Sequence, residues 1–130
     1  MRKYERFVIQ NPIITEEYLY HGKPEEPFRI YMSSDLVPEA NAFADVFWRT
    51  VLPTPNPTCE LHAHPYPQLL MFVGEEGSFE VEVPLNDEMY VITKTTVIWI
   101  PPGVIHNVKY NRIDRPMMES GILIGNGKYL

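Results

Sequence analysis

The sequence has 130 residues, of which 11 are basic and 17 acidic, with a net charge of -6 and a single cysteine, Cys59. This length suits one domain, and a lone cysteine excludes an intrachain disulfide. The acidic balance and the lack of any run of Lys or Arg argue against nucleic acid or an anionic membrane surface as a partner. The first apolar stretch, Phe7–Ile9, is too short for a signal peptide or a membrane span, so we expect a cytoplasmic protein.

The first 44 residues give only local signals. Thirteen prolines are spread over the whole chain and predict few helices. Phe28–Met32 is predicted as a strand and Pro38–Ala44 as one helical turn, whereas residues 10–27 carry no prediction. We expect residues 1–44 to form an N-terminal extension that packs on a domain made by residues 45–130.

Residues 45–130 have the pattern of an all-β sandwich or barrel. Short runs of strand-forming residues alternate with turn signals, at about 8–12 residues per strand and turn. Ser78–Val83 shows the polar and apolar alternation of a half-buried strand. The predicted strands are Asp45–Leu52, Thr58–His64, Gln68–Val73, Ser78–Val83, Met89–Lys94, Thr95–Ile100, Val104–Tyr110 and Met117–Ile124.

Three of the four histidines lie near predicted strand starts. His62 and His64 are two residues apart, so in a strand both imidazoles face the same side and can converge on one ion. His106 follows a Pro-Pro-Gly turn, and Gln68 begins the strand after His64. A pair of surface or hydrogen-bonded histidines is the alternative for His62 and His64 alone. His21 is interpreted as an ordinary loop residue.

The same residues resemble the two motifs of the cupin superfamily. His62-Ala63-His64, Gln68 and Gly74 are similar to the first motif, and Pro101–His106 is similar to the second. The resemblance covers about residues 45–124. It implies an all-β fold of the cupin type, a double-stranded β-helix or jelly-roll barrel. It also implies one divalent transition metal (Mn, Fe, Ni or Zn) on His62, His64, Gln68 and His106.

The sequence departs from the motifs at several positions. Gln68 stands where the motif has an acid, and the spacing from Gln68 to Gly74 is one residue shorter than usual. Thr95 replaces a glycine, and the asparagine that usually follows the last histidine is displaced to Asn111. Of these departures, only the one at Gln68 changes a proposed metal ligand. Its carbonyl oxygen can ligate without adding negative charge, or it can line the cavity without touching the metal; we expect ligation.

Strand parity predicts the surroundings of the ion. An apolar cavity wall is expected from Leu70, Phe72, Val108 and Tyr110, with the Tyr110 phenol as a candidate catalytic proton donor. Glu60 shares a face with His62 and is a second candidate, with a solvated strand-end carboxylate as the equal alternative.

Four further residues near the predicted site are given other roles. Cys59 has the opposite parity to His62 and is predicted to be a packed thiol that points away from the metal. Trp48 and Trp99 are predicted to lie in the core. Arg49 could anchor a substrate carboxylate, although a surface arginine is the preferred interpretation.

These features favour a metal-dependent enzyme that acts on a small organic molecule. Lewis-acid chemistry of the lyase, isomerase or decarboxylase type fits a neutral ligand set, and dioxygenase chemistry is the second option. The alternative is a non-catalytic small-molecule-binding cupin, and a structural cupin with an empty site is the least favoured hypothesis. The resemblance also implies a homodimer.

Overall fold

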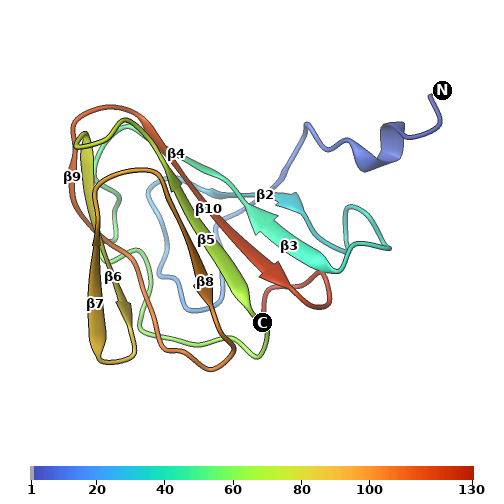
Figure 1. Cartoon of the computed structure of the whole chain (residues 1–130). Coiled ribbons are helices and arrows are strands. Elements are labelled where there is room, and N and C mark those ends of the chain that lie inside the picture. The colour runs from blue at the N-terminus through green and yellow to red at the C-terminus, as the bar shows by residue number, and fades with distance from the viewer. Residues whose placement is uncertain (1) are drawn as a thin grey trace.

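Two antiparallel sheets make up the fold in this computed structural model, which describes residues 2–130. The larger sheet has the strand order β1-β2-β3-β10-β5-β8, with β4 also paired to β10, and the smaller sheet has the order β7-β6-β9 (Figure 1). No helix among these residues is long and apolar enough to cross a membrane. The elements are η1 (Glu5–Phe7), β1 (Ile13–Thr15), β2 (Phe28–Met32), β3 (Ala42–Asp45), β4 (Phe47–Arg49), β5 (Gln68–Val73), β6 (Phe79–Leu85), β7 (Glu88–Ile92), β8 (Thr96–Ile100), β9 (Lys109–Ile113) and β10 (Met117–Ile124).

The hydrophobic core lies between the two sheets. In β6, Phe79, Val81 and Val83 are fully buried, and the intervening residues are only partly covered. They pack against Phe72 of β5 and Met117 of β10 in the larger sheet. This packing is the physical result of the two-residue periodicity of the strands, which places every second side chain on the inner face.

Gly74 sits where the two sheets approach each other closely. A Cβ atom there would lie 2.9 Å from Cε1 of Phe79 and 3.0 Å from the Cβ of Met117. Both of these neighbours are buried core residues and have no room to move. The glycine that follows β5 is therefore required for the core to close.

Most of the predicted strands are confirmed. The bounds of β2, β5 and β10 are those expected from the sequence, and β6, β7 and β8 agree within two residues. Of the predicted strand Asp45–Leu52, only Asp45, the last residue of β3, and Phe47–Arg49, which form β4, are in strands. Val46 lies between these strands, and its N–H donates to the carbonyl of Arg29 rather than to β10.

Other element predictions were wrong. Thr58–His64 forms no strand, because prolines at 57, 65 and 67 limit its ladder to one bridge between His62 and His106. The predicted strand Val104–Tyr110 begins only at Lys109, in β9. Pro38–Ala44 forms no helical turn, because its last residues belong to β3, which pairs with β10.

The tryptophans are also placed differently from the prediction. Trp48 is 69% exposed and Trp99 is 55% exposed, so neither is a core residue. Both project from the outer face of the larger sheet, where Val97 is exposed as well. Alternation alone did not identify the inner face here, because apolar residues occupy both faces of β5 and β8.

The predicted boundary at residue 44 falls inside β3. β2 and β3 are strands of the larger sheet, and β3 pairs directly with β10 at the other end of the chain. The division into an N-terminal extension and a barrel stays a prediction. In the structure, one sheet contains strands from both parts.

Candidate metal centre

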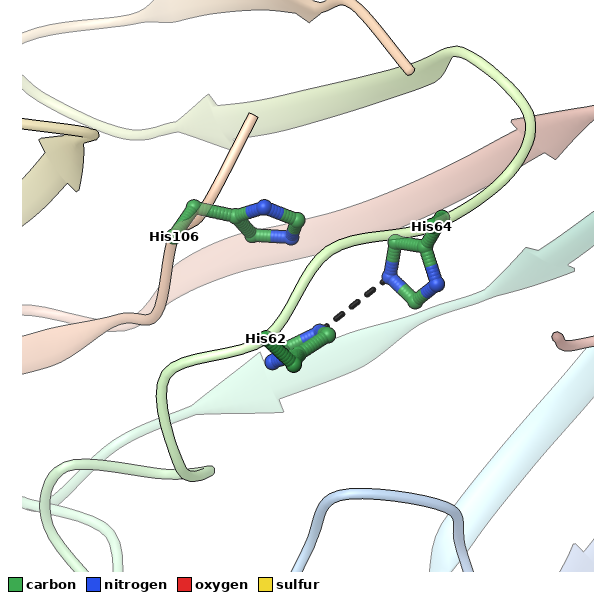
Figure 2. Close-up of side chains that lie close together, drawn as sticks. All are labelled: His62, His64 and His106. Atoms are coloured by element: carbon green, nitrogen blue, oxygen red, sulfur yellow. Dashed lines mark hydrogen bonds between the residues drawn. The ribbon is translucent and has the colours of Figure 1, made fainter. Parts of the chain in front are cut away.

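Three imidazoles meet in the interior of the fold. His62 and His64 lie on the segment that leads into β5, and His106 lies on the segment before β9. Two main-chain hydrogen bonds join the segments: His62 N–H donates to His106 O (3.1 Å), and His106 N–H donates to His62 O (2.9 Å). All three side chains are buried, and their potential ligand atoms lie within 4.8 Å of one another (Figure 2).

Main-chain carbonyls fix the tautomer of each ring. Nδ1 of His62 donates to the carbonyl of Glu60 (2.7 Å), and Nδ1 of His106 donates to that of Val104 (3.0 Å). Nδ1 of His64 donates to the main-chain oxygen of Leu130. A carbonyl can only accept, so each neutral ring carries its proton on Nδ1 and presents the lone pair of Nε2 to the others. This is the arrangement in which carbonyl groups orient histidine ligands.

The donor set fits a cation. The Nε2 atoms of His62 and His64 face each other at 3.1 Å (Figure 2), and with both protons on Nδ1 each Nε2 carries a lone pair. Among residues 2–130, Nε2 of His106 and Oε1 of Gln68 are buried without a hydrogen-bond partner. Buried acceptors of this kind cost free energy unless a hydrogen-bond donor or a cation satisfies them. Three imidazole nitrogens and an amide oxygen suit a divalent transition metal.

Burial keeps these imidazoles neutral. Removal from water lowers the pKa of His62 and of His64 and lowers that of His106 to about 4. The carbonyl acceptors oppose this effect, but burial is the larger cause. Since only a neutral imidazole can ligate, the histidines are in the metal-binding form at neutral pH.

The cavity beside the histidines is small, with a volume of about 40 Å³. Of the four predicted wall residues, Leu70 and Val108 line it. Phe72 and Tyr110 do not line it, and their side chains are almost fully buried elsewhere in the core between the sheets. The Tyr110 hydroxyl donates to Glu119, and burial raises its pKa well above the ordinary value, so it is not a proton donor facing the cavity.

Glu60 has the second of its two predicted roles, that of a solvated carboxylate, whereas Cys59 differs from its predicted position. The Glu60 side chain is exposed, and it is the main-chain carbonyl of Glu60 that orients His62. Cys59 lines the same cavity as His62, since the expected strand parity fails where no strand forms. Its thiol is buried and free, and burial raises its pKa to about 11, so the thiol is unreactive.

The sequence analysis did not predict that charged side chains are buried beside the histidines. Arg49 and Glu119 have side chains only 12% and 8% exposed, and Arg49 Nε donates to Glu119 Oε1 (3.2 Å). The preferred interpretation of Arg49 as a surface residue was wrong. Asp45 Oδ2 accepts from the Tyr18 hydroxyl (2.7 Å), and its Oδ1 accepts from the N–H of Gly121 (2.8 Å). Inward parity with Phe43 in β3 and with Met117 in β10 was the signal that could have found both acids.

Two aromatic side chains from distant parts of the chain complete the site. His21, interpreted as an ordinary loop residue, lines the cavity with its ring centroid 6.1 Å from that of His62. Tyr129 lines it from the other end of the chain, and its hydroxyl lies 3.5 Å from Nε2 of His62. No local motif marks either residue, because tertiary packing alone brings them here.

Asp45 makes the stability of the fold depend on pH. Burial raises its pKa from an ordinary 3.8 to about 7. The folded state therefore binds a proton that the unfolded state has lost, and this contribution is present below pH 3.8 and disappears as the pH rises to about 7.

Asp45→Asn is expected to remove this pH dependence. The free energy of unfolding of the wild type, minus that of the variant, should fall by a few kcal/mol between pH 4 and pH 7.5. Subtracting the two curves cancels the opposite contribution of the buried histidines. Urea unfolding in EDTA at several pH values measures the difference, and a constant difference over this range would contradict the prediction.

The comparisons with known proteins agree with this geometry. The sequence matches no protein-family model and shows no significant match to a curated protein. An RmlC-like cupin from Shewanella frigidimarina has a TM-score of 0.53 at 15% identity, covering 88% of this chain and 84% of that one. A tryptophan-to-tyrosine variant of oxalate decarboxylase from Bacillus subtilis has a TM-score of 0.61 at 12% identity, covering 95% of this chain and 30% of its own.

A third solved structure, the Fe(II) form of HppE, has a TM-score of 0.54 at 10% identity, covering 75% of this chain and 49% of its own. This chain thus spans less than two thirds of the length of oxalate decarboxylase and of HppE. The TM-scores establish a common architecture, and the three histidines that lie together are those of the two sequence motifs. The chain therefore has the cupin fold, an all-β double-stranded β-helix, in which three buried histidines lie close together.

Proposed function

We propose that this protein binds one divalent transition metal (Mn, Fe, Ni or Zn) and is a metal-dependent enzyme for a small organic molecule. His62, His64 and His106 would hold the ion with the Gln68 carbonyl. One observation carries the proposal: three buried imidazoles lie together, and within residues 2–130 neither Nε2 of His106 nor Oε1 of Gln68, which lines the same cavity, has a hydrogen-bond partner. A purely structural histidine cluster would satisfy these acceptors.

The neutral donor set determines which chemistry fits best. When bound, the metal would supply Lewis acidity toward a substrate oxygen, with its charge uncompensated by these protein ligands. Lyase, isomerase or decarboxylase chemistry is therefore favoured over dioxygenase chemistry. Oxalate decarboxylase, which shares the fold, supports the decarboxylase type of chemistry, and the Fe(II) form of HppE supports a divalent transition metal in a protein of this fold.

Asp45 is the residue we propose for proton transfer, in place of Glu60 and Tyr110. It lines the cavity, and its pKa of about 7 lets it both hold and release a proton near neutral pH. The Tyr18 hydroxyl and the Gly121 N–H hold the carboxyl group in place. Neither Glu60, which is exposed, nor Tyr110, which is committed to Glu119, has this combination.

Metal content tests the proposal. Untagged protein reconstituted with Mn, Fe, Ni or Zn is expected to retain about one equivalent of one of them, measured by inductively coupled plasma mass spectrometry. The His62→Ala/His106→Ala double variant should retain none, because two of three imidazoles are lost. His21→Ala is the matched control, since His21 lines the cavity outside the converging cluster. Absence of metal from the wild type after all four reconstitutions would refute the metal-site proposal.

A non-catalytic small-molecule-binding cupin is the second candidate, because neither predicted catalytic side chain, Glu60 or Tyr110, lines the cavity. Substrate turnover that disappears on chelation supports the enzyme; ligand-induced stabilisation without turnover supports the binding protein. We also propose a homodimer. The exposed apolar side chains of Trp48, Val97 and Trp99 on the outer face of the larger sheet support it.

A further inference from the structure

The ring of Tyr20 lies flat against the imidazole of His62. The two ring centroids are 4.5 Å apart, and the ring planes differ by only 17°. Among residues 2–130, this is the only parallel ring contact of the three clustered histidines, whose other ring contacts are tilted or edge-on. A parallel stack restricts the tilt of the imidazole plane, which a hydrogen bond at one ring nitrogen leaves free.

The same two residues are also connected through the main chain. The N–H of Glu60 donates to the carbonyl of Tyr20 (3.0 Å), and the carbonyl of Glu60 accepts from Nδ1 of His62 (2.7 Å). His62 is therefore held at its Nδ1 edge by Glu60 and on one ring face by Tyr20. Both constraints depend on where the main chain places Tyr20.

The main chain of Tyr20 has a conformation that bulky residues rarely adopt. Its φ is +67°, and among residues 2–130 the only other non-glycine residue with a positive φ is Asn86. Tyr20 is the third residue of a turn in which the His21 N–H donates to the carbonyl of Tyr18 (3.1 Å). Glycine and asparagine are favoured at this position of a turn when φ is positive. The turn by itself therefore disfavours a tyrosine, and the contacts with the histidine cluster hold it there.

We propose that Tyr20 is a positioning residue for the metal ligand His62. Its ring fixes the plane of the imidazole, so that Nε2 is directed to the shared ion and does not swing about the Glu60 hydrogen bond. A ligand that is held in place before the ion arrives loses less conformational freedom when it binds. The inference rests on the proposed metal site, and it adds to that site a residue outside both sequence motifs.

Metal affinity tests the inference on four variants. Tyr20→Gly and Tyr20→Asn suit the positive φ but lack the ring, so each should bind the metal ion about tenfold more weakly than the wild type. Tyr20→Phe keeps the ring and should retain the wild-type affinity. Leu19→Ala is the matched control, because it shortens an exposed side chain in the same turn.

Calorimetric titration of metal-free protein measures these affinities, with whichever of Mn, Fe, Ni and Zn the wild type retains. Thermal unfolding in EDTA establishes that each variant is folded. The inference is overturned if Tyr20→Gly and Tyr20→Asn bind the ion as tightly as the wild type. It is also overturned if Tyr20→Phe or Leu19→Ala weakens binding as much as they do.

A readout on metal-free protein separates this inference from the metal proposal. In nitrogen-15 NMR spectra recorded in EDTA at pH 8, His62 should be the pure Nδ1–H tautomer in the wild type and in Tyr20→Phe. Tyr20→Gly and Tyr20→Asn should show both tautomers at His62, whereas His106, which is not stacked on Tyr20, should be unchanged. If the wild type binds no metal, the metal proposal fails, and these spectra still decide the role of Tyr20. An unchanged His62 tautomer in both ring-lacking variants overturns the inference.

Discussion

Gln68→Glu is expected to change stability in opposite directions with and without metal. With a divalent cation bound, a carboxylate at this position adds an attraction of several kcal/mol, part of which is offset by its desolvation. We expect the affinity to rise by roughly a hundredfold. In EDTA the same carboxylate is buried without a cation, so the free energy of unfolding should fall by a few kcal/mol.

The surroundings of Gln68 explain why the chain has an amide here. The Gln68 Nε2 and the Asp45 Oδ1 both flank Gly121, at 3.1 Å and 3.4 Å from the position its Cβ would take. A carboxylate at position 68 would therefore face Asp45, and the like charges would repel each other when no metal is present.

Metal titration of metal-free protein measures the affinity. Thermal unfolding in EDTA and in excess metal measures the stability without and with the ion. Gln68→Ala is the matched control: it lacks the side-chain oxygen and should bind metal more weakly than the wild type in every condition. If Gln68→Glu and Gln68→Ala have the same metal affinity, position 68 does not ligate the metal.

Glu119→Ala is expected to lower the free energy of unfolding by about 3–5 kcal/mol. The side chain accepts from Arg49 and from the Tyr110 hydroxyl, and all three groups are largely buried. Alanine would leave the guanidinium without its charge partner and the phenol without its acceptor. Urea unfolding at pH 7 measures the loss.

The double variant Arg49→Met/Glu119→Gln provides the comparison for this prediction. Removing both charges avoids an unpaired buried ion, so the double variant should be more stable than Glu119→Ala. A loss below about 1 kcal/mol in Glu119→Ala would show that the pair behaves like an exposed ion pair.

The sequence predicted the strands best where pairing and alternation agree. β5 and β10 are adjacent, pair over six residues, and have the expected bounds. The segment around His62 was harder to predict, because a run of prolines replaces strand pairing with a single bridge. The histidines still converge, since the bridge fixes His62 opposite His106 independently of strand parity. Cys59, which depended on parity alone, was misplaced.

The rest of the site depends on tertiary packing that no local pattern reports. His21 and Tyr129 come from opposite ends of the chain, and nothing in their neighbours marks them as cavity residues. Asp45 and Glu119 were missed for another reason. From sequence alone, a charged residue at an inward position is interpreted as a strand end or a solvated group. Only the structure shows that Asp45 is paired with Tyr18 and Glu119 with Arg49.

The carbonyl that holds His64 belongs to Leu130, 66 positions further along the chain. His62 and His106 are likewise joined only after two remote segments have met. These long-range contacts carry the entropy cost of closing long loops, so an unfolded chain offers an ion no preformed cage. Ion binding would therefore be coupled to folding of the whole domain. The metal would stabilise the folded state after it has formed and would not direct its formation.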